Sequence, residues 1–178
     1  MINKYIFNKR KKHTIILLHG LYATAGFWLS YLNLFGNFKI VTFDINYSLL
    51  LKEQNPESYL QEHIKEFLEN ENIVAIVSHS FGTVISDLAF IKKDFPIFKI
   101  CPVAFSIRID TQSFITDIEK KTSLSKENIY EYMNLVRNFL SKFKQQLNLN
   151  GLIYIPDQDG FFTRELPLSK KSVYRESF

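Results

Sequence analysis

Continuous apolar runs alternate with amphipathic stretches along most of the chain. Such runs occupy 14–18, 38–43, 73–77, 98–105 and 151–156. An aliphatic run of this length, without alternating polar positions, suits a parallel strand that is covered on both faces. Helices are predicted between the runs, over 27–35 before Gly36, from the capping residue Asn55 with Pro56 in its first turn, and after residue 80. This alternation predicts an α/β fold with three layers and a mostly parallel sheet.

Two segments depart from the simple alternation. Residues 5–7, followed by a basic turn, are expected to form an edge hairpin with the strand at 14–18. Between 110 and 150 the strand signal disappears, and apolar residues recur at helical spacing. We interpret 110–150 as a helical lid inserted into a single domain that spans 1–178. The alternative is an ordinary crossover helix whose apolar stripe covers the sheet.

The composition narrows the classes of function. The chain has 178 residues, 46% of them hydrophobic, and a net charge of +4 that comes largely from scattered lysine pairs. A basic surface can attract nucleic acid, anionic lipid or an acidic protein, but the sequence contains no nucleic-acid motif. No apolar run approaches the ~18 residues of a membrane span, and the N-terminus lacks the order of a secretory signal. We therefore expect a cytoplasmic protein without a membrane span or nucleic-acid partner.

Metal and disulfide chemistry find little support in the sequence. The chain has a single cysteine, Cys101, in an apolar run, and a small buried side chain is the expected role for it. Cysteines and histidines do not cluster with metal-ligand spacing. The sequence thus predicts neither a metal site nor a cofactor.

The candidate chemistry lies in the segment Ser78-His79-Ser80-Phe81-Gly82, between a predicted strand and a predicted helix. A serine on such a tight turn projects its hydroxyl above the sheet, and the turn needs small residues two positions to either side. Gly82 meets this requirement, and Ser78 departs from the usual glycine by one hydroxymethyl group. The alternative is a serine that stands at a strand end by chance.

The order of these pieces resembles the α/β-hydrolase superfamily. His19-Gly20 follows the first buried strand with Trp28 further on, Asp44 follows the next strand, the serine turn comes after the third, and Pro156-Asp157-Gln158-Asp159 follows the last. The resemblance implies that Ser80 is a nucleophile and that the backbone amides of Leu21 and Phe81 form its oxyanion hole. It also implies that Asp159 is the acid, with Asp157 and Asp110 as the other candidates. The residues expected at the substrate are His19, Gly20, Tyr22, Trp28 and Phe161, with Phe81 and Met133 as further candidate walls, although core filling is favoured for Met133.

The catalytic base is where the sequence departs from the superfamily. Members carry it on a histidine beyond the acid, but residues 160–178 contain no histidine. Three explanations stay open: a lost or truncated C-terminus, a different base, or a degenerate hydrolase that only binds. We expect ordinary roles for the four histidines, and for His19 the bracing of the oxyanion loop.

A narrower resemblance is to the esterases of biotin synthesis, which demethylate pimeloyl-[acyl-carrier protein] methyl ester. It implies a small acyl ester substrate, carried on an acidic carrier protein that basic lid residues attract. Those residues are Lys120, Lys121, Arg137, Lys142 and Lys144. The competing hypothesis is a noncatalytic protein that uses the same scaffold to bind an acyl ligand or a protein partner.

Overall fold

The structure of the protein is a computed structural model. The structure describes residues 2–68, 71–90, 96–100, 115–116, 118–120, 124–143, 152–154 and 173–174. Within these residues seven strands form one sheet in the order β1-β3-β2-β4-β5-β6-β7. The strands are β1 (Ile2–Phe7), β2 (Thr14–Leu18), β3 (Lys39–Ile45), β4 (Ile73–His79), β5 (Ile97–Ile100), β6 (Leu152–Tyr154) and β7 (Val173–Tyr174). All neighbouring pairs are parallel except β1 with β3, so the expected mostly parallel sheet is confirmed.

The expected hairpin between 5–7 and 14–18 is wrong. β1 pairs with β3, with Ile2 opposite Ile45 and Phe7 opposite Ile40. β2 instead lies between β3 and β4 and is parallel to both. The physical reason is burial: β2 is buried at every position and apolar at all but Thr14, whereas β1 mixes exposed and half-buried residues and suits the edge of the sheet.

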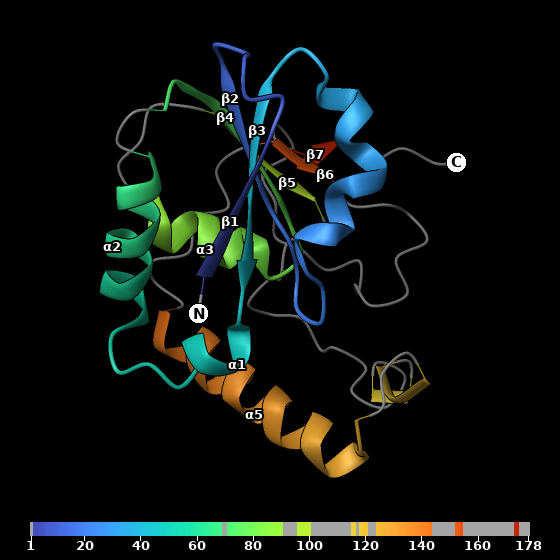
Figure 1. Ribbon diagram of the computed structural model, residues 1–178. Coiled ribbons are helices and arrows are strands. Elements are labelled where there is room, and N and C mark those ends of the chain that lie inside the picture. Colours follow the sequence, from blue (N-terminus) through green and yellow to red (C-terminus); the bar gives the residue numbers. More distant parts are fainter. Residues whose placement is uncertain are drawn as a thin grey trace.

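The helices cover both faces of the sheet, as Figure 1 shows. α2 (Pro56–Leu68) and α3 (Gly82–Ala89) lie on one side, and the 3₁₀ helix η1 (Ala25–Phe35) lies on the other. The Asn55 side chain accepts a hydrogen bond from the Ser58 amide, which is the predicted N-cap of α2. A short helix, α1 (Tyr47–Leu50), follows β3 directly and begins at the Asn46 cap.

The core divides according to the alternation of side chains along the strands. Ile16 and Leu18 of β2 pack with Ile85 of α3 in the larger cluster. Ile15 and Leu17 point to the other face of the sheet and pack in a second cluster with Trp28 of η1. Two apolar faces on each central strand require a layer of helices on each side, which gives the three-layer arrangement.

The helix α5 (Lys126–Phe143) occupies a different position. It crosses near the carboxyl ends of β3 and its neighbours and lies next to α1 in Figure 1. Val136 and Phe139 join the larger core cluster, while Ile129 and Met133 form a small cluster with Ile115 and Ile118. Met133 is thus a core residue of this part of the chain. The lid over 110–150 stays a prediction, with α5 as its described part.

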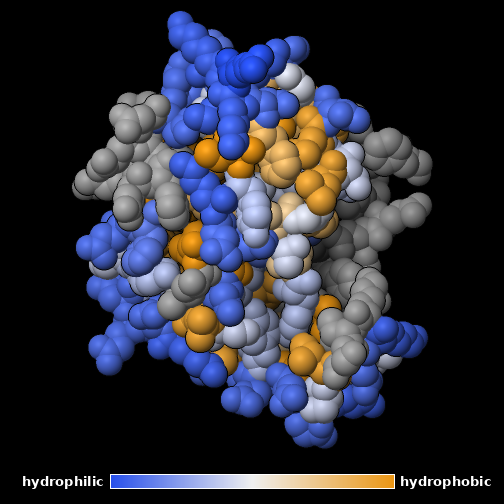
Figure 2. All heavy atoms as spheres, in the orientation of Figure 1, coloured by the Kyte–Doolittle hydropathy of each residue, from blue (hydrophilic) through white to orange (hydrophobic). Residues whose placement is uncertain are grey.

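None of the helices in the described residues is long and apolar enough to cross a membrane. The face in Figure 2 is mostly hydrophilic, with an apolar area at the upper right over η1, where Leu29, Tyr31 and Leu34 are exposed.

Candidate active site

Ser80 adopts a strained backbone conformation at the end of β4. Its φ angle is 51°, in the left-handed region that residues other than glycine rarely occupy. Such strain costs about 1–3 kcal/mol and persists only where the surroundings hold it. Here the Ser80 amide donates to the Ile100 carbonyl at 2.9 Å, and the Ser80 carbonyl accepts from the Thr83 hydroxyl at 2.7 Å. The chain therefore makes a held, sharp turn between β4 and α3 at the half-buried serine.

The two small residues that flank this turn are explained by their contacts. A Cβ atom at Gly82 would lie 2.7 Å from the carbonyl oxygens of Leu18 and His19, so only glycine fits there. Ser78 is fully buried, and its hydroxyl donates to the Phe98 carbonyl at 3.2 Å. The departure from glycine at position 78 is thus accommodated by a hydrogen bond to the neighbouring strand.

Gly20 brings the segment 19–22, called the His-Gly loop below, against the serine. A Cβ atom at Gly20 would lie 2.8 Å from Ser80 Cβ and 3.3 Å from Ser80 Oγ. Real Cβ atoms do not approach other atoms so closely, so a glycine is needed at this position. The two motifs that the sequence analysis singled out, 60 positions apart in the printed sequence, are therefore in direct contact.

His19 is fully buried, and both of its ring nitrogens bond to backbone groups. Nε2 accepts from the Ile45 amide at 3.2 Å, so Nε2 carries no proton, and Nδ1–H donates to the Gly20 carbonyl at 2.8 Å. Burial lowers the pKa of His19, although the Gly20 carbonyl and the Asp44 charge act in the opposite direction. A neutral imidazole with both nitrogens engaged acts as a brace and cannot serve as the general base in this arrangement.

The bond from His19 to the Gly20 carbonyl also orients the Leu21 amide. A trans peptide is planar, so its C=O and the next N–H point in opposite directions. Because Nδ1–H of His19 fixes the Gly20 carbonyl, it also fixes the direction of the Leu21 N–H. The second expected oxyanion donor is the amide of Phe81, the N-cap residue of α3, whose side chain is fully buried. Their joint role as an oxyanion hole stays a prediction.

The other three histidines lie in different surroundings. His13 is exposed before the start of β2, where a ring nitrogen lies 3.1 Å from Asn72 Nδ2. His63 lies on α2, stacked on Tyr59 at 4.0 Å between ring centroids. His79 stacks on Phe27 at 4.7 Å, and its Nδ1 lies 3.2 Å from the point where a Cβ at Gly20 would stand. Among the four histidines of the printed sequence, His79 and His19 therefore lie beside Gly20 and Ser80.

Tyr47 is a residue of this site that the sequence analysis missed. Its side chain is 4% exposed, and its hydroxyl donates to the His19 carbonyl at 2.5 Å. The ring lies edge-on to His19 at 5.1 Å and to Phe81 at 5.2 Å between centroids. A tyrosine in the first turn of a short helix carries no sequence signal for such a role, because its partners lie 28 or more positions away.

The remaining candidates fall in three places. Trp28 is 3% exposed and packed in the second core cluster, and Asp44 accepts from the Ala25 amide at the start of η1. Tyr22 has a φ of 57° and contacts Tyr132 of α5 at 5.0 Å between ring centroids. Asp159 and Phe161 lie outside the described residues, as do Cys101, Asp110, Asp157, Lys121 and Lys144.

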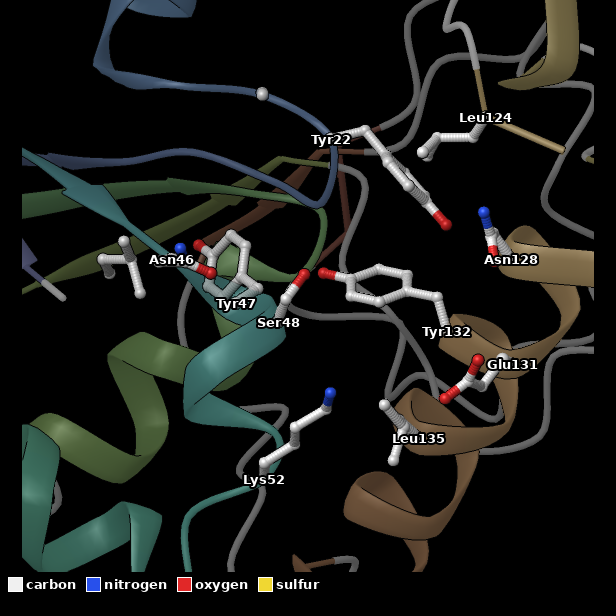
Figure 3. Close-up of a pocket in the computed structure, with 12 residues that line it drawn as sticks. Tyr22, Asn46, Tyr47, Ser48, Lys52, Leu124, Asn128, Glu131, Tyr132 and Leu135 are labelled. Atoms are coloured by element: carbon white, nitrogen blue, oxygen red, sulfur yellow. The ribbon is translucent and has the colours of Figure 1, made fainter.

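A pocket of about 400 Å³ opens between the His-Gly loop, α1 and α5. Figure 3 shows the rings of Tyr22 and Tyr132 on one side and Tyr47 on the other, with Ser48 next to the Tyr132 hydroxyl. Burial raises the pKa of Tyr22 to about 12 and that of Tyr132 further, so both hydroxyls stay protonated at neutral pH. The pocket thus has walls of neutral aromatic side chains next to the loop that carries Leu21. The charged side chains that line it are Lys52 and Glu131.

Several solved structures that are distant in sequence share this architecture. A hydrolase from Oleispira antarctica superimposes with a TM-score of 0.59 at 18% identity, covering 98% of this chain and 84% of its own. The thioesterase domain SrfTE, which cyclises the lipopeptide antibiotic surfactin, gives 0.57 at 11% identity over 97% and 84%. A lipase-esterase related protein from Clostridium acetobutylicum gives 0.55 at 12% identity over 88% and 79%.

The class that these likenesses define is the α/β-hydrolase fold, and the fold expected from the sequence is confirmed. No protein-family model matches the chain, and no curated protein sequence does. The structural neighbours are esterases, thioesterases and lipases. At identities of 10–18% they establish the fold and leave the activity of this chain to be argued from its own residues.

Proposed function

We propose that this protein is a serine hydrolase that cleaves carboxylic esters through an acyl-enzyme on Ser80. The main support for the proposal is the strained turn at Ser80, which lies between β4 and α3 and against Gly20. The φ angle of Ser80 is 51°. If Ser80 stood at the strand end by chance, the strained backbone would be unexplained. The glycine beside it would be unexplained as well, because a glycine is needed there only when the two segments approach closely. Both features are accounted for when the hydroxyl has to be presented to a substrate.

The chemistry proceeds in two steps. Ser80 Oγ attacks the ester carbonyl carbon as its proton passes to a general base, and the carbonyl oxygen becomes an anion that the Leu21 and Phe81 amides stabilise. Collapse of this intermediate breaks the C–O bond, and the alcohol leaves with a proton. Water then hydrolyses the acyl-serine and releases the acid. No metal or cofactor enters this scheme.

Asp159 is the proposed acid that orients the base. β6 ends at Tyr154, so Asp159 follows it by five positions. β6 is parallel to β5, and β5 is parallel to β4, which ends at the serine turn. Parallel strands present their carboxyl ends at one edge of a sheet, which supports a place for Asp159 on the same side of the molecule as Ser80.

Covalent labelling tests the proposal directly. A fluorophosphonate probe reacts with an activated serine, so we expect the full chain to be labelled at one site and the Ser80→Ala variant to lose the label. Ser58→Ala is the matched control, because Ser58 is an exposed serine on α2, and it should label like the wild type. Absence of labelling in the folded full chain would contradict the hydrolase and favour the noncatalytic acyl-binding protein.

The narrower substrate that we propose is pimeloyl-[acyl-carrier protein] methyl ester. It is supported by exposed cationic side chains on α5, which crosses the carboxyl edge of the sheet, including Lys126, Arg137 and Lys142. An acidic carrier protein would be attracted to such a surface. The test is release of methanol from the carrier-bound ester, together with rescue of a biotin-requiring strain that lacks its own esterase. Cleavage of simple esters without either result would leave the general hydrolase standing and reject this substrate.

A further inference from the structure

We propose that Tyr47 is a positioning residue of the catalytic centre, whose hydroxyl holds the His-Gly loop so that the Leu21 amide faces the reacting carbonyl. The inference rests on the proposed function, because it assigns to the loop the role of an oxyanion donor. It adds a residue outside both sequence motifs, contributed by α1, and it makes the hydroxyl rather than the ring the functional group.

The end of β3 and the start of α1 hold His19 by two separate hydrogen bonds. The Ile45 amide donates to Nε2 of the imidazole at 3.2 Å, and the Tyr47 hydroxyl donates to the His19 carbonyl at 2.5 Å. The first bond fixes the ring, and the second fixes the peptide between His19 and Gly20. His19 is fully buried and Tyr47 is 4% exposed, so water does not easily replace either bond.

These bonds form a chain that leads to the expected oxyanion donor. Tyr47 fixes the His19–Gly20 peptide, and His19 Nδ1–H fixes the next peptide through the Gly20 carbonyl at 2.8 Å. The Leu21 N–H belongs to that second peptide and points opposite to its carbonyl. Gly20 has no side chain to limit its rotation, so the direction of the Leu21 amide depends on both restraints.

The Tyr47 ring also contacts the other side of the site. It lies edge-on to the Phe81 ring at 5.2 Å between centroids and to the His19 ring at 5.1 Å. Phe81 supplies the second expected donor, so one side chain is wedged between the residues that carry or orient both amides. Burial also raises the pKa of Tyr47 well above its usual value, and the hydroxyl therefore remains a donor throughout the pH range of an esterase assay.

The variant Tyr47→Phe tests the hydroxyl while keeping the ring and its packing. We expect kcat on a p-nitrophenyl ester to fall about 10- to 100-fold, since misplacing a reacting group by about 1 Å costs ~10² in rate. KM should change less than threefold, because the ester binds before the oxyanion forms. The matched control is Tyr59→Phe on α2, where the ring stacks on His63 and not on the loop, and it should retain the wild-type kcat.

A pair of inhibitors separates positioning from a general loss of structure. A trifluoromethyl ketone forms an anionic adduct with the serine and needs the oxyanion donors, whereas the methyl ketone of the same chain binds without that charge. Tyr47→Phe should weaken the first by the same factor as kcat and leave the second unchanged. All rates are normalised to the concentration of serine that a fluorophosphonate titrates, so a partly unfolded preparation still gives an answer.

The outcomes distinguish the two proposals. An unchanged kcat in Tyr47→Phe, with an active wild type, would overturn the role of Tyr47 and leave the hydrolase intact. Equal weakening of both ketones would also overturn it, because that pattern reports a damaged site rather than a misdirected amide. A wild type that neither turns over esters nor reacts with the probe would contradict the proposed function itself.

Discussion

At the scale of single residues, the site depends on two positions where the covalent geometry leaves almost no choice. Ser80 occupies a left-handed backbone conformation that the hydrogen bonds from Thr83 and to Ile100 sustain. Gly20 lies directly against Ser80, at a position where a side chain would not fit. Each feature has a cost by itself, strain in one case and backbone entropy in the other. Their coincidence at one contact is the strongest structural sign of a reacting hydroxyl.

Gly20→Ala is expected to reduce activity severely. The new methyl group would lie 2.8 Å from Ser80 Cβ, so either the serine or the His-Gly loop has to move by a large fraction of an ångström. A displacement of that order lowers kcat/KM on a simple ester by about 10²-fold. Gly36→Ala is the control, since a Cβ there would meet its nearest atom at 3.5 Å and the φ angle is −57°. Equal activity of the two variants would contradict the close contact at Gly20.

The sequence predicted the residues that carry their own signal and missed those that act through distant contacts. Ser80, Gly82 and Gly20 were singled out because a serine turn and a His-Gly pair have recognisable local patterns, and the structure brings Gly20 and Ser80 together. Tyr47 was missed because its role exists only after folding, when its hydroxyl meets a carbonyl 28 positions away. Asp159 was predicted as the acid from its order along the chain, lies outside the described residues and stays a prediction.

At the scale of elements, the alternation of strands and helices was predicted well because burial on both faces leaves a distinctive pattern. β2, β3, β4 and β5 all fall within their expected apolar runs or extend them by one or two residues. Lys99 of β5 is a charged residue inside one of these runs, and it is 1% exposed. Its ammonium lies 2.6 and 2.9 Å from the two carboxylate oxygens of Asp87 in α3. A charge in a core strand is thus explained by a partner on the covering helix.

Lys99→Met is expected to destabilise the protein strongly. Removing the ammonium leaves the Asp87 carboxylate, 8% exposed, without this charge partner, and breaking a buried pair in this way costs about 3–5 kcal/mol. The double variant Lys99→Met, Asp87→Leu should recover most of that loss, because two apolar side chains of similar size replace the pair. Urea unfolding of the three proteins measures the difference. A double variant that loses the sum of both single effects would show that the two groups are not coupled.

At the scale of the whole molecule, the position of β1 and the role of α5 are the features that local patterns did not determine. β1 closely precedes β2 in sequence, yet β3 separates them in the sheet, because the buried β2 needs a parallel neighbour on each side. α5 shows an apolar stripe that suits either a lid or a core helix. Its buried residues Val136 and Phe139 belong to the main cluster, and its more N-terminal residues belong to a separate small one. The two halves of α5 are therefore attached to the protein differently.

Phe139→Ala measures how firmly α5 is attached. The Phe139 ring is 5% exposed and lies 5.8 Å from the Phe81 ring between centroids, so it anchors the helix next to the expected oxyanion donor. If this half of α5 is part of the core, truncation should lower the free energy of unfolding by about 3–5 kcal/mol. Tyr130→Ala on the same helix is the control, because Tyr130 is 42% exposed and surface changes usually stay within ±0.5 kcal/mol.

The size of the effect decides how a lid could work in this molecule. A helix that swings away as a unit has to expose Phe139 to water, and burying a phenylalanine is worth about 1.5–3 kcal/mol. A large loss of stability in Phe139→Ala would therefore confine any opening to the N-terminal turns of α5, around Ile129 and Met133. A loss below about 1 kcal/mol, with unchanged labelling of Ser80, would instead contradict the anchored helix and allow the whole of α5 to move.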